Sequence, residues 1–114
     1  MSEFNEHIAE VEVVFEDSQG VRKPGLLYIG RPHLHQPGEW RCPVGIFPLY
    51  ERLPDVAGAD SLHALSSALR LMKSRLKSFY RRGGKIHARN DRRGHDEEQP
   101  FSFGSYFDFG DGDN

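Results

Sequence analysis

A chain of 114 residues is long enough for one domain, and its 37% hydrophobic and 28% charged residues are ordinary for a globular protein. A domain of this size buries roughly two thirds of its unfolded surface, which leaves little room for an enclosed active site. No apolar run approaches the ~20 residues that span a bilayer, so we expect no membrane segment.

The start of the chain and its cysteine content indicate the cellular compartment in which the protein resides. Residues 1–6 are acidic and lack the basic and apolar regions of a signal peptide. Cys42 is the only cysteine, so no intrachain disulfide can form, which fits a reducing environment. We therefore expect a cytoplasmic protein.

The net charge of −2 conceals a strong segregation of charge along the chain. Residues 1–69 carry ten acidic and five basic side chains, and residues 70–93 carry one acidic and ten basic side chains. Residues 94–114 carry six acidic side chains and no Lys or Arg. Any functional use of charge is therefore local.

Three strands are predicted in the first half. In residues 8–16, Val11, Val13 and Phe15 alternate with glutamates, which is typical of a strand with one buried face. Residues 26–29 form a short second strand after a turn at 17–20. Residues 40–50 contain a third strand, in which two prolines indicate an edge or a bulge.

One long amphipathic helix follows. Asp60 or Ser61 is a suitable N-cap, because its side-chain oxygen can accept from an unpaired backbone amide. Gly83-Gly84 is expected to end the helix. Apolar residues recur between these ends in steps of three and four, which predicts a single buried face: Leu62, Leu65, Leu69, Met72, Leu76 and Phe79.

This order predicts an α+β fold, with a three-stranded antiparallel meander and the helix packed on one of its faces. We expect a single domain over residues 1–86, a polar loop or linker over 87–100, and an aromatic and acidic arm over 101–114. The pattern leaves three roles open for the arm. It could add a strand, cover an apolar patch or reach out to a partner.

Two motifs carry a resemblance to a known family: W-x-C-x-x-x-I at residues 40–46 and G-x-D-S-L-x-A-L at residues 58–65. With them, roughly residues 8–80 resemble a small family of uncharacterised bacterial domains, which more often have Gln where this chain has His63. The resemblance implies a strand followed by a helix and no particular activity. The shared residues are of types that favour a structural role over a chemical one. Ala64 and Ala68, for example, would allow the helix to approach the sheet closely.

Motifs for catalysis or metal binding are weak. His33-x-His35 could place two imidazoles on one strand face, but a third metal ligand is lacking nearby. Cys42 lies in an apolar alternation, which favours a buried thiol over a nucleophile. The aspartates near the C-terminus do not complete a calcium loop. We therefore expect no enzymatic activity, no cofactor and no metal.

The basic segment is the clearest functional signal. At 100° per residue Arg70, Lys73, Lys77 and Arg81 fall within one narrow arc. Arg75 and Arg82 lie on the far flank, and further cations follow the helix. This basic surface comprises Arg70, Lys73, Lys77, Arg81, Arg82, Arg89, Arg92 and Arg93. It could be a solvated face, it could meet an acidic protein, or it could follow a phosphate backbone. A pI of about 6.3 and few nearby aromatic residues weigh against nucleic acid.

Together these patterns favour a non-enzymatic protein-interaction module. Its sharpest version is an immunity protein that occludes the cleft of a bacterial toxin. The arm would then enter a basic cleft, since aromatic residues anchor interfaces and complementary charge speeds association. The arm residues in question are Tyr106, Phe107, Asp108, Phe109, Asp111 and Asp113. The alternative is a nucleic-acid-binding module that uses the basic helix 70–82 and the segment 85–93.

Overall fold

The computed structural model describes residues 7–50, 52–90 and 97–107. These residues form eight strands and two helices. In chain order they are β1 (His7–Glu16), β2 (Arg22–Gly30), β3 (His33–Gln36), β4 (Glu39–Cys42), β5 (Val44–Phe47), β6 (Val56–Gly58), α1 (Ser61–Arg81), β7 (Lys85–Asn90), β8 (Glu97–Pro100) and α2 (Phe103–Phe107).

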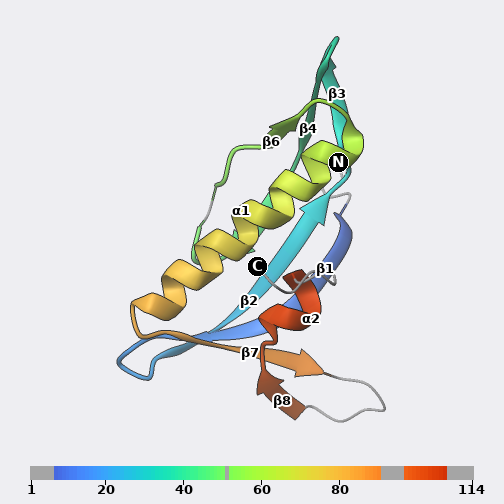
Figure 1. The fold of residues 1–114 in the computed structure, drawn as a ribbon. Coiled ribbons are helices and arrows are strands. Elements are labelled where there is room, and N and C mark those ends of the chain that lie inside the picture. The colour runs from blue at the N-terminus through green and yellow to red at the C-terminus, as the bar shows by residue number, and fades with distance from the viewer. Residues whose placement is uncertain (1–6, 51, 91–96, 108–114) are drawn as a thin grey trace.

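The strands form two antiparallel sheets. Five strands make the larger sheet in the order β5-β2-β1-β7-β8, and three make the smaller sheet in the order β3-β4-β6. Figure 1 shows α1 running diagonally across the larger sheet, with α2 beside it on the same side. We call this covered side of the larger sheet the inner face and the opposite side the outer face.

The α+β class and the helix on one face of a sheet are confirmed, but the predicted strand count is too low. The predicted third strand is divided at Pro43, so that β4 joins the smaller sheet and β5 the larger one. Pro43 cannot donate a ladder hydrogen bond, which explains why the chain leaves one sheet there.

The predicted loop over 87–100 is wrong at 87–90 and 97–100, the parts of it that the structure describes. Residues 85–90 pair with β1, and β8 pairs with β7 to form the edge of the larger sheet. The domain therefore continues past residue 86. The strand that the arm was predicted to add is formed instead by β8, just before the arm. The described part of the arm contains α2.

Helix α1 has the predicted ends. The Asp60 side chain accepts from the backbone N–H of His63 at 2.7 Å, and the chain turns away at Gly83 with φ +93°. The buried stripe is rotated from the predicted one, and consists of Ala64, Ala68, Met72, Leu76 and Phe79. Leu62, predicted to pack, is 69% exposed.

The rotation has a local cause at the start of the helix. Gly58 of β6 lies directly against α1, where an added Cβ would come within 2.3 Å of the Ala64 backbone nitrogen. Ala64, whose backbone makes this contact, is fully buried, and so is Ala68 one turn later. The predicted scaffold role of the two alanines is therefore seen in the packing.

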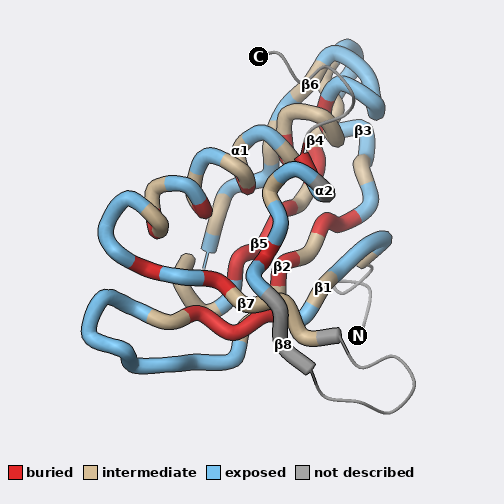
Figure 2. Tube along the Cα trace, turned by 60° about the horizontal axis from the view of Figure 1, so that its bottom comes forward, coloured by how far each residue is buried: buried red, intermediate tan, exposed pale blue. Residues whose placement is uncertain are grey.

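The core lies between the inner face and α1. Figure 2 shows the buried positions concentrated in the central strands and on the side of α1 that faces them. Val13 and Phe15 of β1, Leu27 of β2 and Ile86 of β7 are almost completely inaccessible. Alternate residues of these strands consequently point to the outer face.

The described part of the C-terminal arm, residues 101–107, folds back onto the domain. The backbone N–H of Phe101 donates to the carbonyl of Ile86 at 3.0 Å, which continues the pairing of the β7–β8 edge. The Phe101 and Phe107 side chains are 5% and 8% exposed. Phe103 connects this aromatic cluster to α1 through Tyr80, with ring centroids 5.3 Å apart. Of the three roles left open by the sequence, the described part of the arm covers an apolar patch.

Candidate functional site

The outer face of the larger sheet is the most distinctive surface. Within the described ranges, both helices lie on the inner face and no helix or strand packs against the outer one (Figure 1). Its centre is nevertheless apolar. Val14, Leu26 and Phe47 lie on three neighbouring strands, β1, β2 and β5. Of these three side chains only Phe47 is exposed, at 56%, whereas Leu26 is half-buried and Val14 is 8% exposed.

This apolar centre contains a shallow hollow of about 280 Å³. Pro24, Leu26 and Phe47 form its apolar wall, while Glu12 and Arg89 line it with one charge of each sign. An apolar floor with charged residues around it is the usual composition of a protein-binding surface.

Histidine–carboxylate pairs lie toward both ends of the outer face. At one end His7 Nδ1 lies 2.9 Å from Glu10 Oε1, and the His7 ring stacks on Tyr28 with centroids 3.8 Å apart. At the other end His87 Nε2 lies 3.0 Å from Glu16 Oε1. These partners hold the side chains in place around the apolar centre.

Sequence reasoning did not single out this surface. Val14 interrupts the alternation of glutamates in β1, and Leu26 pairs with Glu12 across β1 and β2. In its own strand, each of these two residues departs from the alternation of polar and apolar side chains. Only strand pairing, which brings β5 beside β2, places Phe47 next to them.

The structure divides the predicted basic surface. Arg70, Lys77, Arg81 and Arg82 are exposed on α1, and Lys73 is half-buried. Arg82 Nη1 donates to the Ser78 hydroxyl at 3.0 Å.

Arg89 lies on β7, where it lines the outer-face hollow rather than continuing the helical stripe. Arg92 and Arg93 lie outside the described residues. The described cations therefore belong to two different sides of the molecule.

The predicted partner-binding arm is also divided. Phe107 belongs to the core cluster, whereas Tyr106 is 42% exposed and stacks on Phe101 with centroids 4.7 Å apart. Asp108, Phe109, Asp111 and Asp113 lie outside the described residues. Among the described arm residues proposed for binding, Tyr106 alone presents a large accessible surface.

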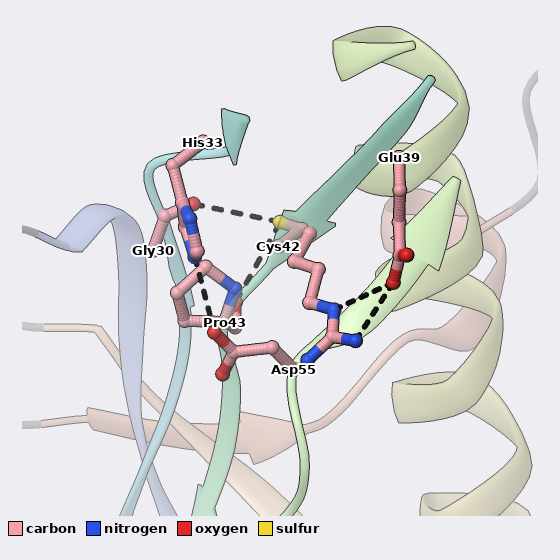
Figure 3. Close-up of polar contacts among 7 residues, drawn as sticks. Gly30, His33, Glu39, Cys42, Pro43 and Asp55 are labelled. Carbon is pink, nitrogen blue, oxygen red and sulfur yellow. Dashed lines mark hydrogen bonds and ion pairs between the residues drawn. The ribbon is translucent and has the colours of Figure 1, made fainter. Parts of the chain in front are cut away.

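Cys42 lies in an environment that keeps the thiol protonated. Figure 3 shows its sulfur facing the carbonyl oxygens of Gly30 and Pro43, at 3.5 and 3.6 Å. Burial, with a smaller contribution from the nearby Asp55 carboxylate, raises the Cys42 pKa to about 11. A nucleophilic cysteine needs the opposite shift, so this geometry fits a structural thiol.

The histidines of β3 have no metal-like arrangement. His33 Nε2 lies 3.2 Å from Asp55 Oδ2, and this pair joins the β3 hairpin to the segment before β6 (Figure 3). On the same hairpin, the hydrogen bond from Arg41 holds the pKa of the Glu39 carboxyl below its ordinary value. Among the described residues, no group of three or more potential ligands could hold a metal ion.

In the part of the chain that the structure describes, no helix has the length and apolar character needed to cross a membrane. No family model, no curated protein and no solved structure matches this chain. The comparisons therefore leave the resemblance at residues 40–46 and 58–65 as a prediction.

Proposed function

We propose that the protein is a non-enzymatic interaction module that binds a protein partner through the outer face of its five-stranded sheet. The observation that carries the proposal is the 56% exposed ring of Phe47, which lies beside an apolar hollow on a sheet face that no described helix or strand covers. Phe47 anchors it, since a large exposed aromatic ring beside a hollow is typical of an interface hot spot.

The charges on this face support a protein partner of mixed polarity. Glu12 and Arg89 both line the hollow, and beyond it lie an exposed His7–Glu10 pair and a partly buried His87–Glu16 pair. A partner with complementary charges would be oriented by them, because such charges affect specificity and association rate more than affinity.

In its sharpest form the proposal is an immunity protein that occludes the cleft of a bacterial toxin. Three glutamates of β1 on the outer face, Glu10, Glu12 and Glu16, would then face a basic surface on the toxin. Tyr106 is the described arm residue available to contribute an aromatic contact.

The test compares two exposed apolar positions on opposite sides of the molecule. A partner captured by the wild-type chain is purified, and its affinity is measured by calorimetry. Phe47→Ser should weaken binding at least tenfold, as loss of an aromatic hot spot does. Leu62→Ser removes a comparable exposed side chain from α1 and should leave the affinity unchanged.

Equal effects of the two substitutions would remove the outer face from the interface. For the immunity version, co-expression should rescue growth of cells that produce the captured toxin. Phe47→Ser should abolish that rescue while the variant remains folded.

A nucleic-acid-binding module is the second candidate, because four exposed cations, Arg70, Lys77, Arg81 and Arg82, lie on α1. Retained binding to DNA or RNA near physiological salt, with a steep fall in affinity as salt rises, would support it. No binding at that salt concentration would exclude it.

A further inference from the structure

A small apolar pocket lies on the inner face, apart from the surface proposed to bind a partner. It occupies about 120 Å³ where α1 and the C-terminal arm meet strands β1 and β2. Leu27, Ile29, Met72 and Phe101 are among its walls, together with Phe107 of α2. A volume of this order accommodates a benzene-sized molecule, roughly six carbon atoms.

The lining offers water few hydrogen-bonding groups. Among the described residues that line the pocket, Glu10 is the one that is charged, and its carboxylate is bonded to His7 on the other side of the sheet. Strand alternation therefore brings the Glu10 backbone, rather than its charge, to this site. An aromatic ring in the pocket would meet the ring of Phe101 and the sulfur of Met72, both favourable contacts for it.

A groove of opposite character adjoins this pocket. It has a volume of about 250 Å³ and is lined by Ser66, Arg70 and Lys73 of α1, together with Leu69 and Phe107. Leu69 and Phe107 line both hollows, so the apolar pocket and the basic groove meet across these two side chains. The three polar residues share one helix face, because they are spaced four and three positions apart.

We propose that the two hollows form one binding site for a small amphipathic anion, an aryl or short alkyl carboxylate. Its apolar group occupies the pocket, and its carboxylate lies in the groove near Arg70. The guanidinium suits this role because its planar array of donors matches the geometry of a carboxylate. The inference does not depend on the proposed protein partner, since the two sites lie on opposite sides of the sheet.

The test uses 3-phenylpropionate with the full chain, followed by calorimetry and by the methyl NMR signals of Leu27, Ile29, Leu69 and Met72. We expect saturable binding at one site. The neutral analogue 3-phenylpropan-1-ol should bind about two- to fivefold more weakly, as expected for an exposed ion pair.

Two substitutions separate the two halves of the site. Arg70→Gln should abolish the preference for the acid over the alcohol, whereas Arg52→Gln, an exposed arginine outside both hollows, should preserve it. Ala9→Leu fills the pocket and should eliminate binding of both molecules. If that variant does not fold, Leu69→Phe tests the same volume from the helix side.

Absence of saturable binding to the wild-type chain would overturn the proposal. So would an acid preference that survives Arg70→Gln, or wild-type affinity in a folded pocket-filling variant.

Discussion

His87 and Glu16 are 71 residues apart in the chain, and their side chains meet at 3.0 Å across the paired strands β1 and β7. Both side chains are partly buried. Glu16 also lies 3.9 Å from Arg22 Nε, so one carboxylate faces side chains from both neighbouring strands. The pair thereby joins the C-terminal hairpin to the centre of the sheet.

His87→Ala should lower the free energy of unfolding by about 0.5–1 kcal/mol, since hydrogen bonds of this kind contribute that much net. Urea denaturation of the variant and the wild type measures the difference. His35→Ala, at an exposed position of β3, serves as the matched control and should change stability by less than about 0.5 kcal/mol. Equal losses would show that the contact is energetically neutral.

Cys42 makes stability depend on pH in the alkaline range. Its pKa is raised from the ordinary 9.0 to about 11 in the fold, so below pH 9 both states keep the proton and the full stability is present. As pH rises from 9 to 11, the unfolded chain ionises first and stability falls by about 2 kcal/mol. Denaturation of wild type and Cys42→Ala across this range isolates the effect, because the variant lacks the thiol and should show a shallower decline.

Gly58→Ala should destabilise the protein by about 1–3 kcal/mol or more, because the new methyl group would collide with the backbone of α1. Thermal unfolding followed by circular dichroism measures the loss. Ala57→Ser alters an exposed neighbour in the same strand and should leave the midpoint nearly unchanged. A stable Gly58→Ala variant would mean that the helix can move away from β6 without cost.

The aromatic arm should contribute to folding as well as to surface properties. Phe101→Ala should cost about 3–5 kcal/mol, since it empties a buried position in the core. Tyr106→Ala should cost clearly less, because its ring is 42% exposed. Chemical denaturation of the two variants provides the comparison, and similar losses would contradict the burial difference.

The burial of the aromatic arm changes the prediction for a chain truncated before residue 101. If the domain ended at residue 86, as the sequence predicts, residues 101–114 would be dispensable for folding. The structure places Phe101 and Phe107 in the core, so a chain shortened before them loses two buried rings.

Local patterns predicted the parts of the fold that depend on neighbouring residues. The cap at Asp60, the stop at Gly83 and the alternation around Val13 each use interactions within a few positions. The rotated helical stripe was missed because hydrophobicity ranks Leu62 above Ala64, whereas in the fold Gly58 packs against the helix backbone at Ala64, which is fully buried.

The β7–β8 hairpin was missed for a different reason. Residues 87–100 contain little apolar sequence, and the buried apolar side chains described at this edge, Ile86 and Phe101, flank the segment. The outer face was missed because its apolar residues come from separate strands. No local pattern shows which strands will be neighbours.

The position of β1 has a consequence for synthesis on the ribosome. This strand is made early, yet it lies between β2 and β7, and β7 is made after α1. Until residues 85–90 leave the exit tunnel, one edge of β1 has no native neighbour and α1 has only part of the sheet to cover. We therefore expect the nascent chain to complete its fold late, with the edge of β1 open to chaperones until then.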